Sequence, residues 1–206
     1  MDRIETQLRA YYEAEAEGRL RPEHGQRRQR LAADAADRWS SAGVGLMLDV
    51  GSGPASDHRQ FAAAGVRYVG ADLALGNARL AAELDQPVVP STLFELPFPD
   101  GVFDAGWSMS TLQHVPDERI DEALFEFVRV LRHGGPVVMG LWGGHDEVIE
   151  SNRATSGLTL DRHFTLRTHD RITEIIGRHV RIDHEEVWPP NEGGWEYHVA
   201  HGTTPD

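Results

Sequence analysis

Short apolar runs alternate with helix-forming stretches through the middle of the chain. The apolar runs lie at 46–50, 67–71, 87–90, 103–108 and 136–142. The stretches of helical composition between and after them lie at 55–65, 75–84, 117–132 and 168–178. Strands that alternate with helices are typical of parallel βαβ units. The pattern therefore predicts an α/β fold, a mostly parallel sheet with helices on both faces.

The two ends of the chain have different patterns. Segments 4–17 and 26–39 are rich in Ala, Glu, Gln, Leu and Arg, with glycine and proline between them, which predicts an N-terminal helical arm. The last two apolar runs, 180–188 and 195–201, flank a turn-rich spacer. They predict a C-terminal antiparallel hairpin that closes the sheet.

Two local features refine this picture. Asp117 is a plausible N-cap for the helix at 117–132, and Gly134-Gly135 is expected to end that helix. The polar stretch from Asp146 to Arg167 has no obvious regular pattern. A loop this long is usually a lid or a substrate-binding element, so we expect an irregular loop there.

Composition limits the classes of function. A chain of 206 residues that is 40% hydrophobic can bury one core, so we expect one domain: a helical arm over 1–43, a core over 44–142 and a substrate side over 143–206. The net charge of −13 disfavours nucleic acid and anionic membranes as partners. There is no cysteine, and the 11 histidines are scattered, so we expect no metal site. The first residues form no apolar signal core and no apolar run approaches about 18 residues, so the expected location is cytoplasmic.

A glycine turn follows the first apolar run. Asp49 precedes Gly51-Ser52-Gly53, and glycines at such a turn let backbone amides approach a ligand closely. A dinucleotide fingerprint needs a third glycine where Ser56 stands. Asp49 would repel a phosphate and attract a cationic amine, and Asp72, at the end of the next run, can accept both ribose hydroxyls. The pattern favours a nucleoside cofactor that carries an amino acid and no phosphate.

A set of motifs carries a family resemblance over roughly residues 44–142. They are Leu48-Asp49-Val50-Gly51-Ser52-Gly53, Val69-Gly70-Ala71-Asp72, Leu96-Pro97-Phe98-Pro99-Asp100-Gly101-Val102-Phe103-Asp104, Leu112-Gln113-His114-Val115 and Arg129-Val130-Leu131-Arg132-His133-Gly134-Gly135. In this order they resemble the class I S-adenosylmethionine-dependent methyltransferases of the small UbiE-like kind. The resemblance implies a Rossmann-like fold and S-adenosyl-L-methionine as the cofactor.

The expected cofactor contacts follow from the turn and from the resemblance. They are Asp49, Gly51, Ser52 through its backbone, Gly53, Asp72 and Leu73, with Ser108, Met109 and Gln113 after the fourth strand. The family commonly has an acidic residue four positions before Leu-Pro-Phe, where this chain has Thr92. The Thr92 hydroxyl can hydrogen-bond to the adenine while Leu93 and Phe94 line the ring; the alternative is that these three are ordinary core at a strand end.

His114 is the candidate general base, since an unperturbed imidazole titrates near pH 6.5. The alternative is a histidine that orients its loop. The expected substrate contacts are Tyr11, Tyr12, Trp142, His145, Arg162 and His163. Adjacent helical positions point in different directions, so at most one of the two tyrosines would face the site. The four residues at or beyond the end of the fifth strand could instead be solvated loop residues or packing aromatics.

These observations predict a methyltransferase that uses S-adenosylmethionine to methylate an oxygen or nitrogen of a small molecule, an acceptor of the kind found in secondary metabolism. Two alternatives remain open. One is a non-catalytic partner subunit that binds S-adenosylmethionine without turnover. The other is a nicotinamide-dependent oxidoreductase on a related fold, against which Ser56 and Asp49 both argue.

Overall fold

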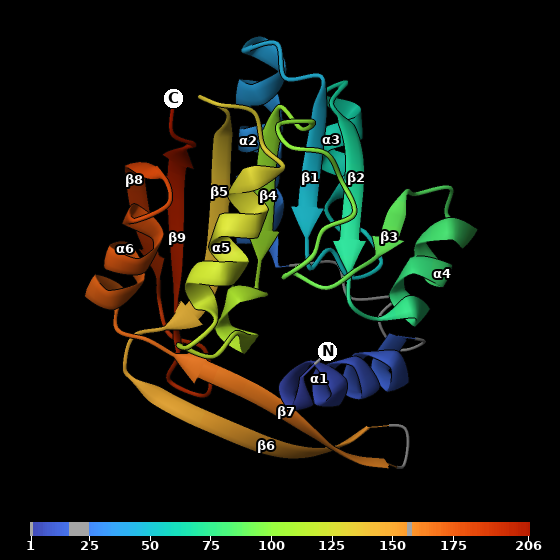
Figure 1. The fold of residues 1–206 in the computed structure, drawn as a ribbon, viewed down its shortest axis with the longest axis vertical. Helices are drawn as coiled ribbons and strands as arrows, with labels where there is room; N and C mark the ends of the chain where they lie inside the picture. Colours follow the sequence, from blue (N-terminus) through green and yellow to red (C-terminus); the bar gives the residue numbers. More distant parts are fainter. Residues whose placement is uncertain (1, 17–24, 156–157) are drawn as a thin grey trace.

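A seven-stranded sheet forms the centre of the protein. The computed structural model describes residues 2–16, 25–155 and 158–206. The sheet has the order β3-β2-β1-β4-β5-β9-β8, with β1 to β5 parallel and β9 and β8 antiparallel (Figure 1). The strands are β1 (Leu46–Val50), β2 (Arg67–Asp72), β3 (Val88–Pro90), β4 (Ala105–Met109), β5 (Pro136–Gly143), β8 (Arg181–Trp188) and β9 (Glu196–Thr203). The predicted Rossmann-like sheet and its C-terminal hairpin are confirmed.

Helices cover both faces of this sheet. They are α2 (Gln26–Ser41), α3 (His58–Ala63), α4 (Leu75–Glu83), α5 (Ile120–Arg129) and α6 (His169–Gly177). Alternate residues of β1 enter opposite cores: Leu48 packs with α5 and α6, and Met47 packs with α2 and α3. A strand buried on both faces reads as a continuous apolar run, which is why the sequence pattern located these strands.

A smaller layer lies beyond the carboxyl ends of the parallel strands. It consists of α1 (Arg3–Glu15) and a two-stranded antiparallel sheet of β6 (Glu147–Thr155) and β7 (Leu158–Leu166) (Figure 1). Helix α1 packs against β7, β6 and α4. The predicted first helix ended at residue 17, which lies outside the described residues.

The expectation of an irregular loop over 146–167 is wrong, because β6 and β7 pair along nine positions there. These strands pair with each other and not with the main sheet, so they lack a continuous apolar run. Their ordering comes from the cross-strand hydrogen bonds and from the contact with α1. The segment is a folded cover beyond the carboxyl ends of the parallel strands, as Figure 1 shows.

The predicted cap of α5 is also wrong. Helix α5 begins at Ile120 after Arg119, without a side-chain cap. The Asp117 carboxylate instead accepts hydrogen bonds from Arg167 (2.9 Å) and Arg171 (2.7 Å). Those partners lie about 50 residues away in the chain, so local sequence gave no sign of them.

Two predicted helix ends also shift. Helix α3 begins at His58 and not at 55, because Ala55 adopts a left-handed φ of 60°. Helix α5 ends at Arg129, and the chain from Leu131 turns to form a bridge with Phe103, so the glycine pair lies beyond the helix.

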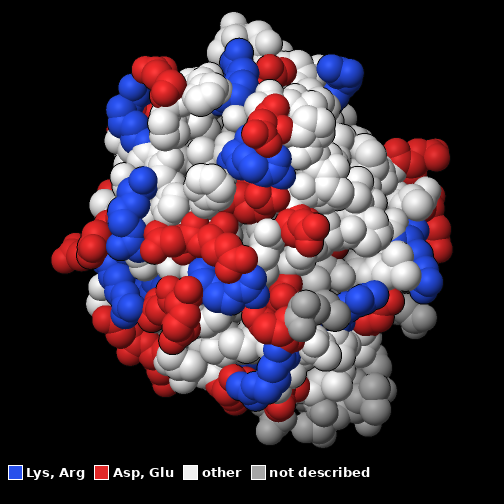
Figure 2. Space-filling view, in the orientation of Figure 1, with Lys and Arg blue, Asp and Glu red and all other residues white. Residues whose placement is uncertain are grey.

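Acidic and basic side chains are mixed on the surface that α5 and α6 present. Figure 2 shows Asp and Glu interleaved with Arg on this face. Ion pairs such as Arg178 with Asp121 and Arg171 with Asp117 account for part of the pattern. No helix in the described part of the chain is long and apolar enough to cross a membrane.

Candidate functional site

A cavity of about 350 Å³ opens at the carboxyl ends of β1 and β4. This is the point where the strand order reverses, because the chain passes from β1 outward to β2 and β3 and then returns to β4 on the other side. Open α/β sheets bind ligands at such a switch point. The predicted site residues that line the cavity are Tyr12, Gly51, Ser52, Gly53, Asp72, Leu73, Leu93, Phe94, Met109, His114, Trp142 and Arg162.

The glycine turn forms one wall of the cavity. Gly51 and Gly53 have positive φ angles of 71° and 57°, which are strained for residues with a Cβ. A Cβ on Gly51 would also overlap the Thr111 side chain. The Gly53 amide donates to the Asp72 carboxylate at 2.8 Å, so the turn and the end of β2 form one unit.

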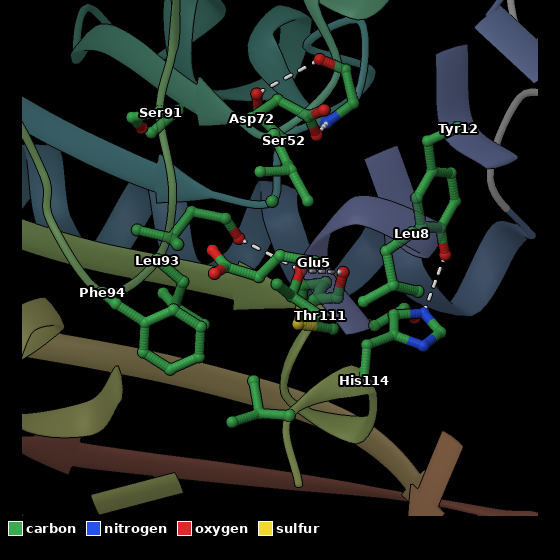
Figure 3. A pocket seen from close by; sticks show the side chains of 18 of the residues that line it. Glu5, Leu8, Tyr12, Ser52, Asp72, Ser91, Leu93, Phe94, Thr111 and His114 are labelled. Atoms are coloured by element: carbon green, nitrogen blue, oxygen red, sulfur yellow. Dashed lines mark hydrogen bonds between the residues drawn. The ribbon is translucent and has the colours of Figure 1, made fainter. Parts of the chain in front are cut away.

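Backbone and side-chain donors orient the Asp72 carboxylate. Besides the Gly53 amide, the amide of Ala74 and the side chain of Asn77 each donate to its carboxylate at 2.9 Å. These contacts hold the carboxylate at the cavity wall between Ser52 and Ser91, where Figure 3 shows it. A carboxylate fixed in this way suits a ligand that presents hydroxyl donors.

Asp49 lies behind the glycine turn and does not line the cavity. It is 1% exposed, and Tyr68 donates to its Oδ2 at 2.6 Å. Its Oδ1 has no hydrogen-bond partner in the described structure. Burial, together with the charge of Asp57, raises the pKa of Asp49 well above its ordinary value. The charged form of this carboxylate is therefore unfavourable in the folded protein, and a cation nearby would stabilise it.

His114 forms the polar end of the cavity with Tyr12 and Arg162. Its Nδ1 lies 2.6 Å from the backbone carbonyl of His163, which can only accept, so Nδ1 carries the proton. In the neutral ring Nε2 then accepts, and the Tyr12 hydroxyl lies 2.7 Å from it (Figure 3). Arg162 donates through Nε to the Tyr12 oxygen at 3.0 Å. The histidine is thus both oriented by its loop and connected to the cavity through Tyr12.

Seven predicted site residues lie outside the cavity lining: Tyr11, Asp49, Thr92, Ser108, Gln113, His145 and His163. Ser108 is fully buried and donates to the Val50 carbonyl at 3.1 Å. Gln113 donates to the Ser110 carbonyl at 2.7 Å and accepts from the Trp142 amide at 3.3 Å. Both side chains therefore hold the cavity wall together from behind.

The other predicted site residues that do not line the cavity lie in the core or at the surface. The Tyr11 side chain is fully buried and donates to Glu15, so of the two adjacent tyrosines it is Tyr12 that lines the cavity. His163 is buried between Glu150 and Thr165 and reaches His114 only through its backbone. His145 is exposed and lies 3.1 Å from Glu147. Thr92 meets the cavity indirectly, through its hydrogen bond to Glu5.

Several lining residues were not among the sequence candidates. Glu5 and Leu8 come from α1, Arg28 comes from α2, and Ser110 and Thr111 follow β4. Glu5, Leu8 and Tyr12 are spaced by three and four positions, so they share one face of α1. The sequence did contain one sign that this helix lines a polar site, namely a glutamate on a helix face that is otherwise apolar and aromatic. Within the described residues, no group of three or more His, Asp or Glu side chains could hold a metal ion.

Known methyltransferases resemble this chain in sequence. Residues 48–139 match a family model described as a methyltransferase domain. An uncharacterized methyltransferase of Mycobacterium sp. (strain JLS) is 36% identical over 169 residues, which cover 74% of this chain and 61% of that protein. A demethylmenaquinone methyltransferase of Mycolicibacterium vanbaalenii is 37% identical over 93 residues, covering 45% of this chain and 40% of that protein. The chain thus spans about three fifths of the length of the first of these relatives.

Solved structures share the fold over nearly the whole chain. The Burkholderia thailandensis 1,6-didemethyltoxoflavin-N1-methyltransferase, solved with S-adenosylhomocysteine, has a TM-score of 0.74 at 19% identity and covers 98% of this chain and 88% of its own. The N-methyltransferase NodS of Bradyrhizobium japonicum has a TM-score of 0.68 at 14% identity, with both chains fully covered. At these identities the likeness concerns the fold.

Proposed function

We propose that this chain, which carries a class I S-adenosylmethionine-dependent methyltransferase domain, transfers a methyl group to an oxygen or nitrogen nucleophile of a small molecule. The cofactor of such a domain is S-adenosyl-L-methionine, which supplies an electrophilic methyl group when bound. The single observation that carries the proposal is the Tyr12–His114–Arg162 group, which lies on the same cavity as the glycine turn and Asp72.

The residues at the turn fit the cofactor. The positive φ angles of Gly51 and Gly53 leave the backbone open to a ligand, and Asp72 offers a fixed carboxylate to ribose hydroxyls. The unpartnered Oδ1 of Asp49 suits the field of a cationic amino group on the other side of the turn. Leu73, Leu93 and Phe94 supply apolar surface for a base.

The opposite end of the cavity is suited to hold the acceptor and receive its proton. The Tyr12 hydroxyl donates to Nε2 of His114 and accepts from Arg162, so its oxygen has a proton to give and a cation to stabilise it. An acceptor O–H or N–H that meets Tyr12 gives its proton to the tyrosine oxygen while the tyrosine proton moves to Nε2. The imidazolium keeps its Nδ1 hydrogen bond to the His163 carbonyl, and the Arg162 guanidinium, 3.3 Å from Nε2, favours the later loss of the proton to solvent.

The shape and charge of the protein favour a small acceptor. Helix α1 and the β6–β7 pair lie over the carboxyl ends of the parallel strands (Figure 1), and residues of α1 and β7 line the cavity. The net charge of −13 repels polyanions such as nucleic acids. The acceptor chemistry we expect is that of phenols, enols and amines of secondary metabolism.

An acceptor screen tests this proposal. The purified protein is incubated with methyl-labelled S-adenosylmethionine and panels of phenols, enols and amines, and the demethylated cofactor and methylated product are measured. We expect formation of both products that depends on the acceptor. Tight cofactor binding without any acceptor-dependent product across the panels would contradict the proposal and support a non-catalytic binding subunit. Binding of nicotinamide cofactors in its place would support an oxidoreductase.

A further inference from the structure

A carboxylate from the N-terminal helix lies in the cavity, far from the turn in sequence. Glu5 is 7% exposed and lines the cavity, and Figure 3 shows it on the side of Leu93 and Phe94, away from the Tyr12–His114 pair. Its Oε1 accepts a short hydrogen bond from the Thr92 hydroxyl, across 87 positions of chain. Neither the catalytic group nor the glycine turn uses this carboxylate.

Local structure fixes one half of the Glu5 side chain. Asp2 and Glu5 form a capping box at the start of α1, in which the Asp2 side chain accepts from the Glu5 amide at 2.9 Å. In return Oε2 of Glu5 accepts from the Asp2 amide at 3.1 Å. Oε2 is therefore committed to the helix end. Oε1 receives only the Thr92 hydroxyl within the described structure, so it keeps room for a second donor.

We expect the base of a bound nucleoside on the side of the cavity where Glu5 lies. The Ser91 amide donates to the Asp72 carbonyl at 2.9 Å, which joins the segment after β3 to the end of β2. A nucleoside whose ribose meets the Asp72 carboxylate therefore has its base beside Leu73, Leu93 and Phe94. Segment 91–94 itself contains serine, threonine, leucine and phenylalanine and has no carboxylate.

We propose that Glu5 accepts a hydrogen bond from the 6-amino group of the adenine of the cofactor, and that the N-terminal helix thereby reads the identity of the purine. An amino group donates two hydrogens, and a carboxylate oxygen is a strong acceptor for one of them. A 6-oxo purine presents an acceptor at the same place, and two acceptors that face each other in a buried site repel. The inference rests on the cofactor and does not depend on the methyl acceptor.

One consequence concerns the covering helix. Because Glu5 belongs to α1, the bound adenine contacts the helix that also carries Tyr12. Cofactor binding then holds Tyr12 in place over His114, so the acceptor end is completed only when the purine is correct. The same helix is tethered on its other side by Glu13, which accepts from the Gly76 amide at 2.9 Å.

Calorimetric titration with S-adenosylhomocysteine and with its 6-oxo analogue, S-inosylhomocysteine, tests the proposal. We expect the unmodified protein to prefer the adenine compound by about tenfold or more, the effect of one unpaired buried hydrogen-bonding group. Glu5→Gln keeps the capping box, since glutamine is accepted at that position. Because its amide can also donate to a 6-oxo group, we expect this variant to lose most of the preference.

Two further variants separate recognition from structural support. Glu13→Gln makes the same change on the same helix away from the base, and it should leave the ratio of the two affinities unchanged. Thr92→Asp added to Glu5→Gln returns a carboxylate to the pair and should restore the adenine preference. Equal affinity of the unmodified protein for the two compounds, or an equal loss of both in Glu5→Gln, would overturn the proposal. If neither compound bound the unmodified protein, the assignment of S-adenosylmethionine as the cofactor would also be wrong.

Discussion

The tautomer of His114 decides which ring nitrogen can accept a proton from Tyr12. The His163 carbonyl fixes the proton on Nδ1 of His114, and this leaves Nε2 to accept from Tyr12. The sequence offered a choice between a base and a histidine that orients its loop. In this geometry the two are compatible, since the hydrogen bond that orients the ring also sets the tautomer that accepts a proton.

Removing the Tyr12 hydroxyl should slow catalysis without removing the cofactor. We expect Tyr12→Phe to lower kcat by about tenfold to a hundredfold, because the proton path to His114 is broken while the aromatic ring remains. His114→Asn should flatten the pH dependence of turnover. Steady-state kinetics against pH, with S-adenosylhomocysteine affinity measured in parallel, checks both. An unchanged kcat in Tyr12→Phe would remove the tyrosine from the proton path.

Asp49 should be a residue whose substitution stabilises the protein and harms binding. Its pKa is raised by burial and by Asp57, so the folded state favours its protonated form. That favourable contribution is complete below the unfolded pKa near 4 and is lost as pH rises through the raised folded pKa. At neutral pH the buried charge is therefore a cost. We expect Asp49→Asn to raise Tm by a few degrees in the absence of cofactor and to weaken binding of S-adenosylmethionine.

Scanning calorimetry at neutral pH and calorimetric titration measure the two effects. Asp57→Asn is the matched control, because Asp57 is paired with Arg28 at 2.7 Å and with the Trp107 indole at 2.9 Å. Its substitution should lower Tm, since it leaves the largely buried Arg28 without the carboxylate with which it pairs. A lower Tm for Asp49→Asn as well would show that the carboxylate stabilises the fold, contrary to this account.

At the scale of elements, one arginine joins β7 to the segment that carries His114. Arg167 is 1% exposed, and it donates to Asp117 at 2.9 Å and to the Val115 carbonyl at 2.7 Å. Further bonds reach the carbonyls of Leu112 and Thr165. Burial lowers the pKa of Arg167, and the carboxylate of Asp117 offsets part of this effect. This side chain explains how the β6–β7 pair is fixed next to the segment that carries His114.

Arg167→Met should therefore destabilise the protein strongly. The change leaves several buried carbonyl groups without a donor and Asp117 without its buried partner, and we expect a loss of about 3 kcal/mol. For a chain of this size that corresponds to a fall in Tm of roughly 6–12 °C. Arg171→Met is the control, because Arg171 binds the other oxygen of Asp117 but is 40% exposed, and exposed pairs contribute about 1 kcal/mol or less. Equal effects in thermal unfolding would contradict the assignment.

At the scale of the whole molecule, the cover is less firmly attached than the sheet. Helix α1 buries only Glu5, Leu8 and Tyr11 in its described length, and it packs on β7, β6 and α4 rather than on the central strands. A part with few buried apolar side chains opens at a lower free energy than the core. We expect the cofactor and the acceptor to enter when this helix moves away.

Hydrogen exchange followed by mass spectrometry should reveal this difference. We expect amides of residues 3–15 to exchange faster than those of β1 and β4, and S-adenosylhomocysteine to slow them. The slowing should be smaller in Glu5→Gln, because the contact between the helix and the adenine is weakened. Exchange in α1 that is as slow as in the sheet before ligand is added would show that the cover does not open.

The sequence by itself determined the parallel sheet, its helices, the glycine turn and the Asp72 carboxylate, because each depends on neighbouring residues. Strand β1 occupies the predicted 46–50, since a strand buried on both faces has a continuous apolar run and ends at a glycine turn. Only the tertiary structure decided the β6–β7 pair, the role of Asp117, the tautomer of His114 and the place of Glu5 in the cavity. The β6–β7 pair joins neighbouring segments, but it packs against α1, which lies far away in the chain. The roles of Asp117, His114 and Glu5 depend on contacts between residues 49 to 87 positions apart, and local patterns do not encode such contacts.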